Sequence, residues 1–262
     1  MILDLFRLDG KVAIVTAAGR GIGARIATAF AEVGADVVIG ARTEDQLREV
    51  AGQVEALGRR AVVVPGDLSS REAMGTLVDT AVRELGGIDI VVNNAGGTMP
   101  QPFMDTTEKA FDQALRWNVT TAFNLSQLAV PHLLERGGGS ILNITSVAGS
   151  FGDRGFAAYG TAKGALIKLT RHMAQDLAPK IRVNSVSPGS ITTSALDMVL
   201  QMPEIEQAMI DGTPLGRLGT VDDIAAAAVY LSSEAGSYVT GRDLRVDGGI
   251  EGSNLEMGIP DL

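Results

Sequence analysis

The sequence contains no cysteine and only two histidines, His132 and His172. The absence of cysteine excludes disulfides, thiolate catalysis and cysteine-bound zinc, and two isolated histidines do not make a ligand cluster. We therefore expect no metal site. A chain without cysteine is also compatible with a reducing compartment, and we expect a cytoplasmic protein.

Long apolar runs and an excess of basic residues are also missing. The formal net charge is −9, and non-specific binding of nucleic acid requires a basic surface instead. No apolar run approaches the roughly 18 to 20 residues of a membrane span. The first residues, MILDLFRLDG, are too acidic and too short for a signal peptide. We expect neither nucleic-acid nor membrane partners.

Hydrophobic residues make up 45% of the 262 residues, which is enough for a sizeable core. Short β-branched runs alternate with longer helical stretches, a pattern that predicts a parallel sheet covered on both faces. No linker interrupts it, so we interpret 1–262 as one doubly wound α/β Rossmann domain. The seven expected strands are 11–16, 35–41, 61–65, 88–93, 140–145, 181–187 and 243–248.

A glycine-rich turn follows the first expected strand, in the stretch TAAGRGIG at 16–23. Gly19, Gly21 and Gly23 lie between a strand and a helix, where glycine lets the backbone turn sharply and approach a pyrophosphate. The N-terminus of the helix then favours the negative charge of that group. The stretch predicts a dinucleotide site, although an ordinary tight turn would have the same composition.

A second feature is AAYGTAKGALIKL at 157–169, a helical stretch that carries Tyr159 and Lys163 one turn apart on one face. Ser146 ends the fifth expected strand, one loop before this helix. Asn118 lies in RWNV, inside a helical stretch where asparagine is unfavourable. Taken singly, Ser146 could be a capping serine and Asn118 a residue at a helix kink.

Two further motifs stand at strand ends, NNAG at 93–96 and PGSITT at 188–193. Together with the glycine-rich turn and the serine, tyrosine and lysine, their order and spacing resemble the short-chain dehydrogenase/reductase family. The resemblance runs from Leu8 to Gly249. It implies an oxidoreductase that interconverts a ketone and a secondary alcohol by hydride transfer with a nicotinamide cofactor.

The resemblance assigns roles to the residues that match the family's motifs. The implied catalytic residues are Asn118, Ser146, Tyr159 and Lys163. The implied cofactor-binding residues are Gly19, Arg20, Gly21, Ile22, Gly23, Arg42, Asp67, Leu68, Asn94, Ala95, Gly96, Tyr159, Lys163, Pro188, Gly189, Ile191 and Thr193. Ala17 stands where the family has its first glycine. Alanine is tolerated if φ is negative there, so we expect a slightly altered turn that still binds nucleotide.

Proton transfer explains why tyrosine and lysine are needed together. A free phenol has a pKa of about 10, too high for a base near neutral pH. The ammonium of Lys163 and the positive nicotinamide ring both favour phenolate, so we expect a lowered pKa at Tyr159. In this scheme Lys163 also holds the nicotinamide ribose, and Ser146 fixes the reacting oxygen. Asn118 resembles the residue that orients a water linked to the lysine.

Two arginines bear on the choice of nucleotide. Arg20 lies inside the glycine-rich turn, and Arg42 follows the second expected strand, which ends without the carboxylate that binds the adenosine ribose of NAD. Arginine accommodates a 2′-phosphate, so we favour NADP(H) and keep NAD(H) as the alternative, since an arginine at a strand end is often only solvated. Asp67 resembles the family's contact to the adenine edge, or is an ordinary turn residue.

The stretch 190–215 is rich in methionine and aliphatic residues, and in the family this region is a lid over the substrate. Adaptable methionines favour an apolar substrate, steroid-like or fatty-acyl-like, although an amphipathic helix that covers the core has the same pattern. The candidate substrate residues are Met99, Ser146, Phe151, Phe156, Met198 and Met202. The tail at 250–262 either reaches a neighbouring subunit's lid or frays.

Gly160 and Gly164 lie one turn apart on the helix of the tyrosine. They would let a helix of a second subunit approach, as a homotetramer or homodimer of this family requires, or they allow close packing within one subunit.

Two other functions stay open. A 3-oxoacyl-[acyl-carrier-protein] reductase needs a basic patch at the pocket mouth, for which Arg136, Arg171 and Lys180 are the candidates. A nucleotide-binding regulatory protein without catalysis is the alternative of another class, and the complete set of site residues argues against it.

Overall fold

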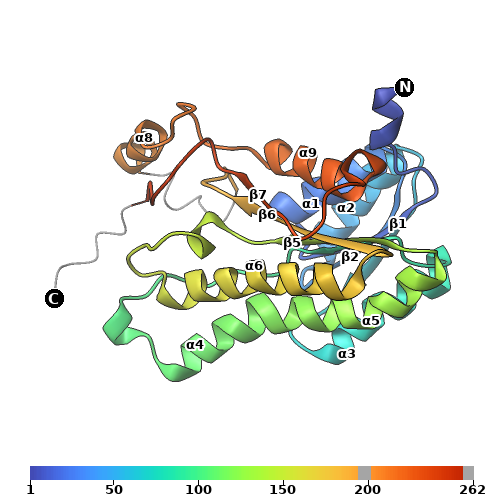
Figure 1. Cartoon of the computed structure of the whole chain (residues 1–262), viewed down its shortest axis with the longest axis horizontal. Helices are drawn as coiled ribbons and strands as arrows, with labels where there is room; N and C mark the ends of the chain where they lie inside the picture. The colour runs from blue at the N-terminus through green and yellow to red at the C-terminus, as the bar shows by residue number, and fades with distance from the viewer. Residues whose placement is uncertain (194–201, 256–262) are drawn as a thin grey trace.

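The structure is a computed structural model that describes residues 1–193 and 202–255. These residues contain one seven-stranded parallel sheet between two layers of helices (Figure 1). All the expected strands are confirmed. They are β1 (Val12–Thr16), β2 (Asp36–Ala41), β3 (Ala61–Pro65), β4 (Ile90–Asn93), β5 (Gly139–Ile144), β6 (Ile181–Pro188) and β7 (Asp243–Val246).

The strand order is β3-β2-β1-β4-β5-β6-β7, and each neighbouring pair runs parallel. The order reverses between β1 and β4, so the connections that follow these two strands leave in opposite directions. Such a reversal opens a crevice at the carboxyl ends of the strands, where doubly wound folds bind their ligands. The expected doubly wound Rossmann fold is therefore confirmed.

The helices cover both faces of the sheet (Figure 1). One layer holds α1 (Gly21–Glu32), α2 (Glu44–Ala56) and α9 (Val221–Ser232). The other holds α3 (Arg71–Thr80), α4 (Glu108–Leu115), α5 (Thr121–Glu135) and α6 (Ala157–Leu177). The helix α8 (Pro203–Asp211) lies apart from both layers (Figure 1). In the described ranges, no helix is both long and apolar enough to span a bilayer.

Short helical turns complete the described part of the chain. Two of them matter for the site, the π-helical turn η4 (Arg116–Thr120) between α4 and α5, and the 3-10 turn η5 (Val147–Gly149) after β5. The others are η1 (Ile2–Phe6), η2 (Ala81–Leu85), η3 (Phe103–Asp105) and η6 (Glu234–Gly236).

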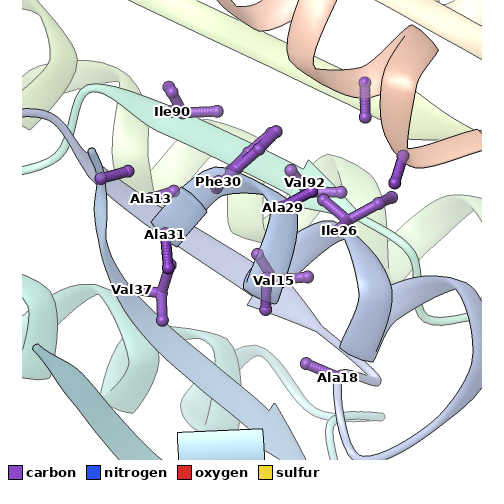
Figure 2. Close-up of a cluster of buried hydrophobic side chains, with 14 of the residues drawn as sticks. Ala13, Val15, Ala18, Ile26, Ala29, Phe30, Ala31, Val37, Ile90 and Val92 are labelled. Atoms are coloured by element: carbon purple, nitrogen blue, oxygen red, sulfur yellow. The ribbon is translucent and has the colours of Figure 1, made fainter. Parts of the chain in front are cut away.

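Successive residues of each strand enter opposite cores, because side chains alternate across a sheet. Ala13 and Val15 of β1 pack with Phe30 of α1 in one cluster (Figure 2). Val12 and Ile14 enter the second cluster, with side chains of α3 and α5. Since both faces are covered, the strands read as continuous apolar runs, and this is why they could be located from the sequence.

A buried carboxylate joins elements at the edge of the sheet opposite the ligand-binding crevice. The side chain of Asp89 is 4% exposed and accepts a hydrogen bond from the backbone N–H of Val12 at 2.9 Å. Arg136 lies 3.1 Å from it and Lys11 lies 3.5 Å from it. A buried charge is tolerated only when it is paired in this way, so Asp89 ties the start of β1 to the end of α5.

We predict that Asp89→Ala lowers the free energy of unfolding by about 3 kcal/mol, because it leaves a buried N–H and two cations without their partner. Denaturant unfolding measures this change. Asp79→Ala removes an exposed carboxylate on α3 and is the control, with a change near zero. Equal effects of the two substitutions would contradict the structural role of Asp89.

Candidate active site

Hydrogen bonds of Thr16, the last residue of β1, connect the glycine-rich turn to the NNAG motif. The side-chain oxygen of Thr16 accepts hydrogen bonds from the backbone N–H groups of Asn94 and Ala95, both at 2.9 Å. The side-chain amide of Asn94 donates to the carbonyls of Thr16 at 3.0 Å and of Ala17 at 3.2 Å. Sequence reasoning missed Thr16, whose one signal is a hydroxyl at the end of a buried strand.

Two glycines of the turn are required for different reasons. A Cβ added at Gly23 would lie 2.5 Å from both the carbonyl oxygen of Ala17 and the side-chain nitrogen of Asn94, so no side chain fits there. Gly21 has a φ of 58°, which glycine adopts readily, and the atom nearest to an added Cβ is the methyl of Thr193 at 3.8 Å. Gly23 is therefore required by close packing and Gly21 by its backbone conformation.

The expectation for Ala17 is wrong in its backbone conformation. Ala17 has a φ of 51°, in the left-handed region, instead of a negative φ. Its carbonyl accepts a hydrogen bond from the side-chain amide of Asn94 at 3.2 Å in this conformation. An alanine in the left-handed region costs roughly 1–2 kcal/mol.

The two arginines flank the same end of the sheet. A Cβ added at Gly19 would lie 3.6 Å from the Cβ of Ala41, so the turn touches the end of β2. Arg20 and Arg42, the next residues along, are both exposed. In the described part of the chain, neither side chain makes an ion pair or hydrogen bond with another residue.

The other predicted residues at this end contribute differently. The carboxylate of Asp67 accepts hydrogen bonds from the N–H and hydroxyl of Ser69, at 3.1 Å and 3.0 Å, as an ordinary turn aspartate does. Leu68 is buried in the second core, so its side chain supplies packing. Ile191 is likewise buried, in the first core, and Gly189 lies against Asp247, whose Cα would be 2.7 Å from an added Cβ.

Tyr159, Lys163 and Ser146 come together where β5 ends and α6 begins. The phenol of Tyr159 forms a hydrogen bond with the side chain of Ser146, which also accepts from the N–H of Ala148 at 3.2 Å. The ammonium of Lys163 is buried and donates to the carbonyl of Ile144 at 2.9 Å. It lies 5.7 Å from the centre of the Tyr159 ring.

Burial shifts both groups toward their neutral forms. It raises the pKa of Tyr159, and the hydrogen bond with Ser146 offsets only part of that effect. It lowers the pKa of Lys163 to about 8. In the chain alone the pKa of Tyr159 is thus raised and not lowered as expected, because desolvation of the phenolate outweighs the hydrogen bond with Ser146. The contribution expected from a bound nicotinamide ring stays a prediction.

Asn118 is fully buried in the π-helical turn η4. Its side chain accepts from the N–H of Gly97 at 2.8 Å and donates to the carbonyl of Ala114 at 2.9 Å. A Cβ added at Gly96 would lie 2.7 Å from the Asn118 oxygen and 2.8 Å from the Lys163 nitrogen. The helical stretch is interrupted at Asn118 by a π-helical turn, and Asn118 lies beside Lys163 across Gly96.

A buried polar network behind these residues was missed from the sequence. The amide of Asn93 donates to Asn143 at 2.8 Å and to Ser126 at 3.0 Å. The amide of Asn143 donates in turn to Thr170 of α6 at 2.8 Å. The network therefore joins β4, β5, α5 and α6. Its one signal was asparagine within apolar strands, where an unpaired amide would be costly.

The glycines of α6 serve contacts within the subunit. A Cβ added at Gly160 would lie 2.7 Å from the carbonyl oxygen of Ala148, and one at Gly164 would lie 3.1 Å from that of Gly149. The turn η5 therefore packs directly on the backbone of α6. Of the two explanations that the sequence left open, close packing within one subunit accounts for these residues.

The predicted substrate residues are only partly brought together. The ring of Phe156 lies 6.0 Å from that of Tyr159, whereas Phe151 lies 6.0 Å from the guanidinium of Arg245. Met99 and Met202 are exposed, at 72% and 53%. Met198 lies outside the described residues, as do the rest of 194–201 within the expected lid and 256–262 of the tail.

The basic patch proposed for a carrier protein does not form at the mouth of this site. Arg136 pairs with Asp89, and Lys180 immediately precedes β6, so both lie at the opposite edge of the sheet. Arg171 lines a cavity of about 300 Å³ with Lys168 and His172 on the outer side of α6. Within one chain the three cations are therefore remote from Tyr159.

Known proteins place this architecture in a family. A family model described as enoyl-(acyl carrier protein) reductase matches residues 16–251. An uncharacterised oxidoreductase of Mycobacterium tuberculosis (strain CDC 1551 / Oshkosh) is 54% identical, over 100% of both chains. The chain belongs to the short-chain dehydrogenase/reductase family. The family resemblance inferred from the motifs is confirmed, and the chain is an oxidoreductase that acts on CH–OH groups.

Solved structures of other short-chain dehydrogenases/reductases share the fold. A 7α-hydroxysteroid dehydrogenase complexed with NADH and 7-oxo glycochenodeoxycholic acid is 45% identical, with a TM-score of 0.91 over 94% of this chain and 96% of that one. A gluconate 5-dehydrogenase from Burkholderia cenocepacia J2315, in complex with NADP and tartrate, is 34% identical, with a TM-score of 0.89 over 95% and 98%. Relatives of this chain thus bind NADH or NADP.

The buried ammonium predicts a pH-dependent stability. Between pH 8 and 10.5 the unfolded chain holds the lysine proton and the folded chain does not, so the free energy of unfolding rises with pH in that window. Relative to Lys163→Met, the wild type should gain about 1 kcal/mol between about pH 7 and about pH 9, in denaturant unfolding without cofactor. Lys168→Met, on the exposed side of α6, should show no such difference. A constant gap between wild type and Lys163→Met would contradict the burial of the charge.

Proposed function

We propose that this enzyme reduces ketones of apolar molecules, and oxidises the corresponding secondary alcohols, with NADP(H) as the hydride carrier. The observation that carries the proposal is the Tyr159 phenol, which is bonded to Ser146 and lies one helical turn from the buried Lys163. These groups lie at the carboxyl edge of the sheet, at the same edge as the glycine-rich turn.

The chain's own residues handle the proton. The bound dinucleotide would supply or accept the hydride. Tyr159 donates its proton to the carbonyl oxygen in reduction and takes a proton from the alcohol in oxidation. Ser146 donates a hydrogen bond to the same oxygen and fixes its position. Lys163 holds the nicotinamide ribose and, as a cation, favours the phenolate.

The raised pKa of the Tyr159 phenol favours the reduction of ketones over the oxidation of alcohols. Burial holds the pKa of the phenol above its ordinary value, so the group is protonated at neutral pH before the reaction begins. A protonated tyrosine is the form that a carbonyl substrate requires, whereas an alcohol substrate requires phenolate. We therefore expect the pH optimum of ketone reduction to lie well below that of alcohol oxidation.

Two observations on the chain support NADP(H). The exposed Arg20 and Arg42 have no partner in the described residues, whereas eight other arginines form ion pairs there with carboxylates. Both lie where the glycine-rich turn touches the end of β2, and no carboxylate occupies that strand end. Guanidinium groups in this position suit a 2′-phosphate.

The rim of the site supports an apolar substrate. Met99, Phe103 and Met104 on the loop after β4 are 72%, 77% and 72% exposed. The backbone N–H of Gln101, in the same loop, donates to the carbonyl of Gly155 at 2.9 Å, close to the start of α6. Several large apolar side chains that remain in water at one edge mark a surface for an apolar ligand.

Assembly and location are also part of the proposal. A homotetramer or homodimer in the cytoplasm is consistent with the family and with the absence of cysteine. The geometry within one chain does not favour docking of an acidic carrier, since the basic residues expected for it lie away from Tyr159. The complete set at Ser146, Tyr159 and Lys163 favours an enzyme over a regulatory nucleotide-binding protein.

We predict that Tyr159→Phe lowers kcat for ketone reduction by at least about a hundredfold, because the proton donor is removed while the ring remains. The measurement is NADPH consumption with a panel of hydroxysteroid ketones, acyl thioesters, sugars and aromatic ketones. Tyr238→Phe changes a fully exposed phenol and should keep wild-type rates. If Tyr159→Phe reduces the same ketones at the wild-type rate, the mechanism is wrong.

Arg42→Ala should weaken NADPH binding by about ten- to a hundredfold and leave NADH binding unchanged, because only the former carries the phosphate. Arg20→Ala should act in the same direction. Fluorescence titration of both cofactors gives the ratio directly, with Arg83→Ala, an exposed arginine paired with Glu84, as the control. An unchanged ratio in both variants would remove the arginines from the explanation.

A further inference from the structure

The chain that follows β7 forms a C-terminal strap, which we define as residues 248–255. Its start is packed closely on the segment after α8. The carbonyl of Gly248 accepts from the N–H of Leu215 at 3.1 Å, and a Cβ added at Gly248 would lie 2.5 Å from the methyl of Thr213. Ile250 is 3% exposed. The first half of the strap is therefore an ordered part of the subunit.

Asn254, near the other end of the strap, uses both atoms of its side-chain amide. Its oxygen accepts a hydrogen bond from the hydroxyl of Ser190 at 2.7 Å. Its nitrogen donates to the carbonyl of Met209 at 3.1 Å and to the hydroxyl of Thr213 at 3.0 Å. Among side chains of this size, only a primary amide can accept a hydrogen bond through its oxygen and donate two through its nitrogen.

The hydrogen-bond partners of the amide oxygen and of the amide nitrogen lie in different parts of the site. Ser190 lies in the segment after β6 that the sequence assigns to the cofactor, and its carbonyl accepts from Gly219 at 2.9 Å. Met209 is the buried residue of α8, and Thr213 follows Gly212, the residue that caps the end of this helix. Asn254 therefore bridges the expected cofactor segment and the end of α8, which lies within the stretch 190–215 that is expected to form a lid.

The position of α8 explains why a contact through Asn254 matters for this helix. This helix lies apart from the two helical layers, and the chain after β7 runs toward it (Figure 1). A further contact joins the strap to the loop before α6, since the hydroxyl of Ser253 donates to Asp153 at 2.6 Å. The strap thus connects three segments at the carboxyl edge: the loop before Tyr159, the segment after β6, and α8.

We propose that Asn254 is a positioning residue that holds α8 against the segment after β6 and so sets the fit of the substrate. The proposal rests on the function proposed above and on the lid expected at 190–215, since it takes α8 as the part of that lid that covers the carbonyl substrate. Loss of the amide leaves α8 without this bridge while the proton-transfer groups at Tyr159 stay in place. Substrate binding should therefore suffer more than the chemical step.

The kinetic test uses the full chain with the best ketone substrate. Asn254→Ala should raise KM for the ketone about tenfold, the effect of losing hydrogen bonds at a partly buried site, with kcat changed less than about threefold. Asn254→Asp keeps the acceptor for Ser190 but loses both donors, so it should raise KM to a similar extent. The thermal midpoint and the affinity for NADPH in the absence of ketone should stay close to those of the wild type.

Two other substitutions serve as matched comparisons. Thr213→Val keeps the shape of the side chain and removes one acceptor of the amide, so its KM should lie between those of the wild type and Asn254→Ala. Glu251→Ala alters an exposed residue of the same strap and should leave KM unchanged. A KM for Asn254→Ala no higher than that of Glu251→Ala would overturn the proposal, and so would a parallel loss of thermal stability and NADPH affinity.

A second measurement tests the role of Asn254 independently of whether the enzyme reduces ketones. Hydrogen–deuterium exchange of the backbone amides in 205–213 should be faster in Asn254→Ala than in the wild type and in Glu251→Ala, with no substrate present. Faster exchange in a protein that reduces no ketone would support the bridge and reject the proposed function. Unchanged exchange in a protein that reduces ketones would reject the bridge alone.

Discussion

The site depends on the burial of one ammonium group. Lys163 reaches the interior between β5 and the NNAG loop, where the carbonyl of Ile144 is its hydrogen-bond acceptor. Room for it exists because residue 96 has no side chain, and because Asn118 pairs with the loop backbone on the other side. Burying a desolvated cation with the carbonyl of Ile144 as its hydrogen-bond acceptor costs free energy. Residue 96 must therefore lack a side chain, and residue 118 must bind the loop backbone, for the ammonium to fit.

The polar groups around this cation are ordered by the strands that end beneath them. Thr16 at the end of β1 binds the backbone of the NNAG loop, and Asn93 at the end of β4 connects through Asn143 to α6. Each amide and hydroxyl named in this network has a hydrogen-bond partner, so the network stabilises one arrangement of the loops. The parallel sheet thereby supplies a rigid base for side chains that come from distant parts of the sequence.

Much of this could be predicted from the sequence, because buried parallel strands and glycine-rich turns have local signatures. The left-handed backbone at Ala17 could not, because alanine favours negative φ and the contact of its carbonyl with Asn94 joins segments far apart in the sequence. Nor could the pKa of Tyr159, since spacing shows that a cation is near but not how completely the phenol is desolvated. The roles of Thr16 and Asn254 depend on pairings between distant segments, which no pattern along the chain records.

The amide of Asn254 has a thermodynamic consequence. If Asn254 positions α8 as proposed, this one side chain, which contacts both the segment after β6 and the end of α8, couples the free energies of the two segments. A ligand that orders one of them lowers the cost of ordering the other, and reciprocity requires the same factor in both directions. Occupancy of the nucleotide crevice and of the space under the lid would then be linked within one subunit, without any change in the sheet.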